Sequence, residues 1–106
     1  MIHLEARIKE EIVRKFSALP EVRRVILFGS RARGDAGERS DIDLAIDAPG
    51  VHLRQWYNIA DVVEELETLL PIDLVFLAEA TSTLLDKITS EGAVLYERRE
   101  SATEAH

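Results

Sequence analysis

The sequence predicts an α/β (α+β) domain in which a mixed β-sheet carries helices packed mainly on one face. Segments with apolar residues at helical spacing alternate along the chain with short aliphatic, β-branched runs. Glycine or proline lies between most of these segments. At 106 residues, 46% of them hydrophobic, the chain is long enough for one domain that buries roughly two-thirds of its unfolded surface.

Three helices are expected, over about residues 3–18, 52–70 and 81–89. In the first, apolar residues recur every four positions from Leu4, and the pattern ends before Pro20. In the second, Trp56 and Tyr57 share a face with aliphatic residues, so both are expected in the core. Pro71 should end this helix.

Four strands are expected, over about residues 22–28, 40–46, 71–77 and 93–96. If a short helix begins near Ser30, directly after the first strand, its N-terminus adds a favourable dipole for an anion. Residues 98–106 lack large apolar side chains. We therefore expect a domain over residues 1–97 and a flexible polar tail over residues 98–106.

Two aspartates share one face of the second predicted strand. Side chains alternate across a strand, so Asp41 and Asp43 lie together, opposite the aliphatic residues between and after them. Two negative charges about 6.5 Å apart repel by about 2.5 kcal/mol at an effective dielectric near 20. A hard cation such as Mg²⁺ would relieve this repulsion, and a solvated acidic face is the alternative.

A glycine–serine turn follows the first predicted strand. Gly29 allows backbone N–H groups to approach a phosphate closely, and Ser30 adds a hydroxyl. Arg31 and Arg33 come next, and such a local excess of arginine in an acidic chain suits an anionic ligand. The alternative is that these arginines pair with acidic residues of the same loop.

A third carboxylate is expected on a later strand. Asp73 is the charged residue inside the apolar third strand, and burying it without a partner would be costly. Asp47 is the alternative, because it lies an even number of positions after Asp41 and Asp43, which places it on the same face of the strand. It lies beside a proline and a glycine, where the strand should already be ending, so Asp73 is favoured.

The residues Leu27–Gly34 and Ser40–Leu44, read as LFGSRARG and SDIDL, resemble the signature of the minimal nucleotidyltransferases, the MNT group of the DNA polymerase beta superfamily. The resemblance extends over nearly the whole chain. It implies a nucleotidyltransferase-like fold, ATP as substrate and two bound Mg²⁺ ions. Carried over residue by residue, it gives triphosphate contact to Gly29 and Ser30 and metal binding to Asp41 and Asp43, and it implies a third carboxylate on a later strand. With Asp73 as that carboxylate, the expected catalytic and metal-binding residues are Asp41, Asp43 and Asp73. Arg31 and Arg33 are expected to neutralise phosphate charge.

The resemblance also implies a partner. Minimal nucleotidyltransferases are commonly paired with a small helical HEPN protein as antitoxin and toxin, and the transferase adds AMP to a tyrosine of that protein. Larger members carry an extra helical domain at the acceptor side, and nothing beyond residue 97 is expected to form one here. We therefore expect a homo- or hetero-oligomer in which another chain completes the site.

Two other functions stay open at this point. The chain could be a non-catalytic binding module that neutralises a helical partner by occlusion. It could also transfer a nucleotide to a small molecule, although the missing acceptor domain disfavours this function. The intact set of aspartates favours catalysis, because a pure binding module has no reason to place carboxylates where they repel.

Composition excludes several classes. With 13 basic against 20 acidic residues, the formal charge is −7, which argues against a broad nucleic-acid-binding face. Cysteine is absent, which excludes disulfides and suits a cytoplasmic protein. No apolar run approaches the roughly 20 residues that cross a bilayer, and no signal peptide is expected.

Overall fold

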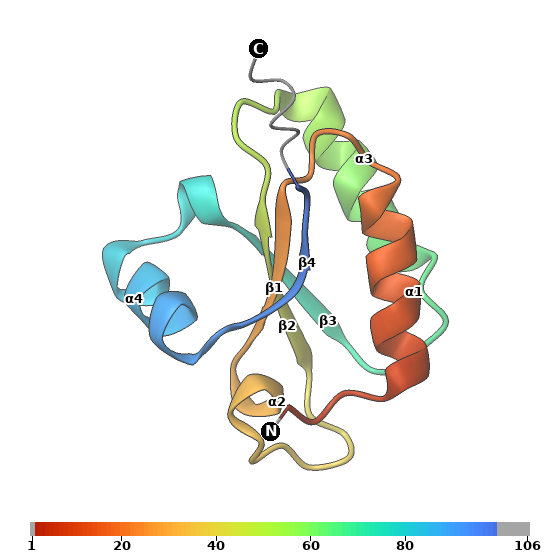
Figure 1. Ribbon diagram of the computed structural model, residues 1–106, viewed down its shortest axis with the longest axis vertical. Coiled ribbons are helices and arrows are strands. Elements are labelled where there is room, and N and C mark those ends of the chain that lie inside the picture. The colour runs from red at the N-terminus through yellow and green to blue at the C-terminus, as the bar shows by residue number, and fades with distance from the viewer. Residues whose placement is uncertain (1, 100–106) are drawn as a thin grey trace.

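The computed structural model describes residues 2–99 and shows four strands with helices on both sides (Figure 1). In chain order the elements are α1 (Ala6–Ser17), β1 (Arg24–Phe28), α2 (Ser30–Arg33), β2 (Ile42–Asp47), α3 (Leu53–Glu64), β3 (Ile72–Phe76), the 3₁₀ helix η1 (Leu77–Glu79), α4 (Ser82–Glu91) and β4 (Ala93–Glu97).

The strands form one mixed sheet in the order β3-β2-β1-β4. The strands β2 and β3 are parallel, and β1 is antiparallel to both β2 and β4. The α/β class and the mixed sheet are therefore confirmed. The parallel pair requires a long crossover, which α3 supplies.

The main core lies between the sheet and the helices α1 and α3. Alternate residues of β2, namely Ile42, Leu44 and Ile46, point into it and are fully buried. From α1, Ile12 and Phe16 meet them, also with no exposed surface. This apolar layer is what fixes the positions of the strands.

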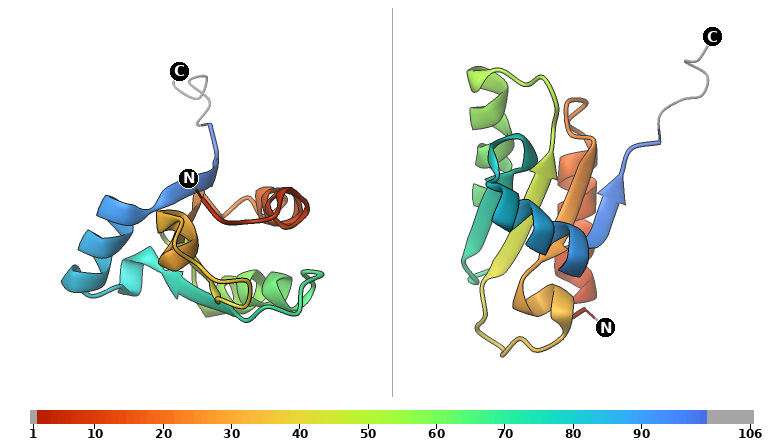
Figure 2. Two further views of the ribbon diagram at one scale, coloured as in Figure 1. Left: turned by 90° about the horizontal axis from the view of Figure 1, so that it is seen from below. Right: turned by 90° about the vertical axis from the view of Figure 1, so that its left-hand side faces the viewer.

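The opposite face of the sheet is covered only in part, by α4 (Figure 2). Ile88 of α4 packs on Ile26 and Phe28 of β1 and on Ala45 of β2, in a second and smaller cluster. The two longest helices do lie on one face, as predicted, but α4 lies on the other. Sequence periodicity showed that α4 has an apolar face without showing which side of the sheet it covers.

The helix α3 ends at Glu64, earlier than the predicted Leu70. A non-local contact holds the chain after it: the buried carboxylate of Glu11 accepts hydrogen bonds from the backbone N–H of Glu67 at 3.0 and 3.2 Å. Tyr57 of α3 is 58% exposed, so its expected place in the core was wrong.

Arg98, which the sequence assigns to the tail, is anchored. Its guanidinium donates to the backbone carbonyls of Ser17, Leu19 and Val22 at 2.8 to 3.1 Å. Ordered structure therefore continues past residue 97. Residues 100–106 lie outside the described residues, so a flexible tail there stays a prediction. Among the helices of residues 2–99, none combines the length and the apolar character of a membrane span.

Candidate active site

Two carboxylates lie beside each other on the face of the sheet that α4 covers in part. Asp43 of β2 and Asp73 of β3 occupy paired positions of the parallel ladder, where neighbouring strands are about 4.8 Å apart. Asp41 lies one residue before β2 and is exposed. The predicted acidic residues thus come from two adjacent strands at one end of the sheet.

The surroundings of Asp43 disfavour its negative charge. Partial burial raises the pKa of the Asp43 carboxyl, and the negative charge of Asp73, a hydrogen bond with Asp73 and the charge of Asp41 raise it further. The positive charge of Lys87 on α4 acts in the opposite direction and lowers that pKa. A carboxylate pair held in this way is a place where a cation would be stabilised.

Gly29 allows this carboxylate to reach its position. The residue has φ +77°, which side chains rarely tolerate, and a Cβ added there would collide with Oδ2 of Asp43. The register explains the contact, because Phe28, the residue before Gly29, pairs with Asp43 across β1 and β2. The glycine–serine turn and the acidic pair are therefore in direct contact, and the short helix α2 begins at Ser30.

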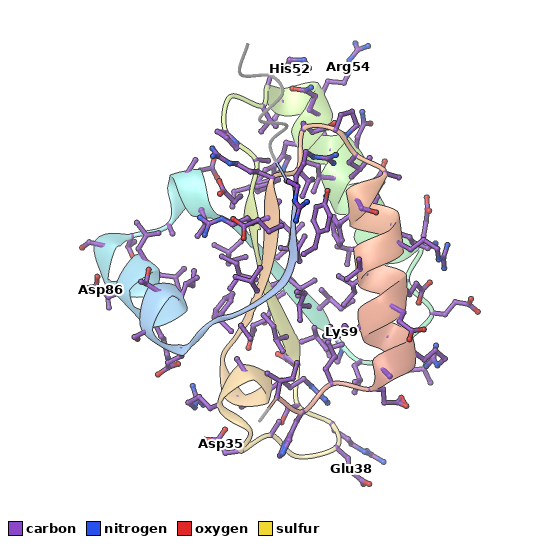
Figure 3. All side chains as sticks on the ribbon, viewed as in Figure 1. Lys9, Asp35, Glu38, His52, Arg54 and Asp86 are labelled. Atoms are coloured by element: carbon purple, nitrogen blue, oxygen red, sulfur yellow. The ribbon has the colours of Figure 1, made fainter. Side chains whose placement is uncertain are left out.

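Arg31 has a different role from the one the sequence predicts. It is 7% exposed, and its guanidinium donates to the backbone carbonyls of His3, Ser40 and Glu38 at 2.8, 3.0 and 3.2 Å, with a longer contact to that of Gly37. Figure 3 shows this loop, with Asp35 and Glu38 labelled. Arg31 holds the loop between the turn and β2 in place, so it is not retained as a phosphate ligand.

Arg33 is already paired. Its guanidinium donates to Asp35 at 3.2 Å and to Glu91 of α4 at 3.0 Å, and these two carboxylates raise its pKa. The alternative of pairing within the loop is therefore observed for Asp35. The bond to Glu91, a residue 58 positions away, joins α2 to α4.

Asp47 lies away from the acidic pair. It is the last residue of β2 and pairs with Arg24 of β1 at 2.8 Å. Four residues along a strand separate it from Asp43 by about 13 Å. The choice of Asp73 over Asp47 as the third carboxylate stays a prediction.

The residues present fit Mg²⁺ in their donor chemistry. Among residues 2–99, no three acidic or histidine side chains converge into a ready-made cation site. Mg²⁺ is commonly held by one or two carboxylates together with substrate phosphates, so the facing pair Asp43 and Asp73 supplies the protein ligands that such a site needs. An apolar cavity of about 350 Å³ between α3 and the end of β3, lined by Ile46, Trp56 and Phe76 among others, does not include either carboxylate of the pair.

A mixed sheet that places a glycine–serine turn against paired carboxylates has the architecture of a nucleotidyltransferase domain. Residues 10–101 match the family model for "Polymerase beta, Nucleotidyltransferase". The match covers most of the chain, so the protein belongs to this family of nucleotidyltransferases.

Solved structures with the same fold include toxin–antitoxin complexes. A chain of a toxin–antitoxin complex with AMP-PNP matches with a TM-score of 0.68 and 23% identity, over 86% of this chain and 74% of that one. A chain of the toxin–antitoxin MntA–HepT matches with a TM-score of 0.64 and 21% identity, over 89% and 74%. A chain of the complex between tri-AMPylated Shewanella oneidensis HEPN toxin and MNT antitoxin gives 0.61 and 21%, over 86% and 71%. No curated protein sequence matches the chain.

Lys87 and Glu91 were missed by the sequence reasoning, although both lie close to the residues that it chose. The available signal was helical spacing: both lie within one turn of the buried Ile88, on the flank of α4 that meets α2. That signal becomes useful only once the face of the sheet covered by α4 is known.

Proposed function

We propose that this chain is a Mg²⁺-dependent adenylyltransferase that transfers AMP from ATP to a tyrosine hydroxyl of a small helical HEPN-type toxin, and so acts as its antitoxin. The observation that carries the proposal is the contact between the glycine–serine turn and the facing carboxylates Asp43 and Asp73. Such a site serves the phosphate and the metal at the same time.

The comparisons support the finer parts of the proposal. Family membership establishes the nucleotidyltransferase class. One complex of similar fold holds AMP-PNP, which suits ATP as the substrate. In another, the HEPN toxin beside an MNT antitoxin is tri-AMPylated, which suits a protein acceptor. A cytoplasmic location, where ATP and Mg²⁺ are available, belongs to the same proposal.

The first task of the site is to hold the nucleotide. Ser30 and the backbone N–H groups around Gly29 would bind the triphosphate, because a hydroxyl and the N–H groups of a turn suit phosphate oxygens. Asp41, Asp43 and Asp73 would hold the two Mg²⁺ ions of the family mechanism. Bound Mg²⁺ supplies charge neutralisation at the phosphates and at the attacking and leaving oxygens.

The second task is the transfer itself. The acceptor oxygen forms a bond to the α-phosphorus of ATP, the bond from that phosphorus to the bridging oxygen breaks, and pyrophosphate leaves. Asp73 accepts the proton of the acceptor hydroxyl, because it is more exposed than Asp43 and so can be reached from outside. Asp43, enclosed by Gly29 and its acidic neighbours, stays a ligand.

The test begins with the neighbouring gene, which the proposal expects to encode a short helical HEPN protein. With labelled ATP and Mg²⁺, the purified chain alone should give at most slow self-labelling. Adding the partner should give a partner mass increase of one or more AMP groups. The variant Ser30→Ala/Asp41→Asn/Asp43→Asn should lose this labelling while the complex still forms, because these residues act on nucleotide and metal.

A matched control is Asp47→Asn, which changes an aspartate of the same strand outside the site and should keep the labelling. If the triple variant neutralises the toxin as well as the wild-type chain does, the occlusion function replaces the catalytic one. Labelling of a small molecule in place of the partner would contradict the protein acceptor alone.

A further inference from the structure

The helix α4 presents two different flanks along the sheet. Its inner side is fixed by Ile88, which is 3% exposed and packs on β1 and β2. One flank carries Leu85 and Thr89, which line a cavity together with Arg24 of β1. The outer side carries Asp86, which points away from the sheet in Figure 3.

The remaining flank faces the candidate active site. Glu91 on this flank accepts a hydrogen bond from Arg33 at 3.0 Å, which ties α4 to α2 directly after the glycine–serine turn. Lys87 precedes Glu91 by four residues, so the two side chains lie on one side of the helix.

Lys87 is an unengaged cation at this site. Its side chain is exposed and forms no hydrogen bond or ion pair with the rest of residues 2–99. The nearby arginines are occupied, since Arg31 is enclosed by backbone carbonyls and Arg33 is bound by two carboxylates. Asp41, Asp43 and Asp73 make the region acidic, so a triphosphate that enters it needs a positive partner.

We propose that Lys87, on the flank of α4 that meets α2, binds the pyrophosphate end of the nucleoside triphosphate. This inference rests on the proposed function and adds a residue to it. In the proposed function the α-phosphorus lies beside Asp73. Glu91 joins α4 to Arg33 of α2, the helix that follows the glycine–serine turn proposed to bind the outer phosphates. A lysine suits this role because a flexible ammonium follows phosphate oxygens as they leave.

The experiment compares two nucleotides in four proteins. Titration calorimetry with Mg²⁺ measures the binding of a non-hydrolysable ATP analogue, and of AMP at millimolar concentration, to wild type, Lys87→Met, Lys87→Arg and Lys9→Met. Lys9→Met is the matched control, an exposed helical lysine on α1, across the sheet from α4. Melting temperatures confirm that the variants are folded.

Lys87→Met should bind the ATP analogue about tenfold more weakly, the scale of one charged hydrogen bond, and AMP with less than about twofold change. Lys87→Arg should stay within about threefold of wild type for both, and Lys9→Met should match wild type. Equal weakening of both nucleotides, or no weakening, in Lys87→Met would overturn the assignment while leaving the proposed function intact. If wild type binds no ATP analogue, the proposed function fails and the assignment falls with it.

Discussion

Alternate residues of β2 form two faces with different environments, one apolar and buried and the other acidic and partly exposed. On the α1/α3 face, Ile42, Leu44 and Ile46 are fully buried in the main core. On the α4 face, Asp43 is only partly buried, among charges that disfavour its own. Because the pleat alternates, the core that fixes the strand also fixes the position of the aspartate, and the cost of the acidic pair is offset on the other side of the sheet.

The α4 face is itself divided along its length. At one end Arg24 pairs with Asp47, in the middle Ile26 and Ala45 pack under α4, and at the other end Asp43 meets Gly29. Asp47 is thus neutralised by Arg24 at one end of β2, whereas Asp43 has acidic neighbours at the other end. Charge balance, rather than strand parity, separates the candidate catalytic aspartates from the structural one.

The largest expected effect tests this division. Asp73→Asn should keep nucleotide binding and lower AMP transfer to the partner by about 10²-fold or more, because a general base is removed. Asp47→Asn should change transfer less than about threefold and cost under about 1 kcal/mol of stability, as expected for a partly exposed ion pair. Transfer rates with labelled ATP, and urea unfolding, measure both. The reverse pattern would make Asp47 the third carboxylate of the site.

A smaller effect tests the face of β2 that is buried against α1 and α3. Leu44→Ala removes a fully buried side chain from the main core and should lower the free energy of unfolding by about 2–5 kcal/mol. Leu69→Ala is a matched control, because Leu69 is fully exposed, and it should change stability by less than about 0.5 kcal/mol. Urea denaturation gives both values. Equal losses in the two variants would show that the core does not hold β2 as described.

The fold was largely predictable because its signals are local. Runs of aliphatic residues marked the strands, and Gly29 marked the turn at the end of β1. The end of α3 was not predictable, since leucines continue at helical spacing to Leu70 and the contact that holds the following chain comes from Glu11, 56 residues before Glu67. The side of the sheet that α4 covers has no local signal either.

The candidate site shows the same limit. The motif places the acidic residues and the turn, because their types and spacing report the chemistry directly. Arginine type alone could not separate Arg31 from Arg33. The first is enclosed by carbonyls that include one from His3, 28 residues earlier, and the second forms an ion pair with α4. A cation in a motif has several possible partners, and only the folded chain selects among them.

The smallest expected effect compares neighbouring residues on the two faces, since Asp43→Asn should act on stability in the opposite direction to Leu44→Ala. The pKa of Asp43 is raised in the folded chain, so the folded state binds the proton more tightly than the unfolded state does. The resulting stability is present below the unfolded pKa and is lost as pH rises through the folded pKa.

Near neutral pH, without metal, Asp43→Asn should therefore be more stable than wild type by a few tenths of a kcal/mol, a small gain because the carboxyl is partly solvated. At pH 3 the difference should vanish, and Mg²⁺ with ATP should stabilise only the wild-type chain. Thermal unfolding at the two pH values, with and without Mg²⁺ and ATP, measures these differences. If Asp43→Asn is less stable than wild type at neutral pH, the neighbours of Asp43 stabilise its charged form, which would contradict the prediction.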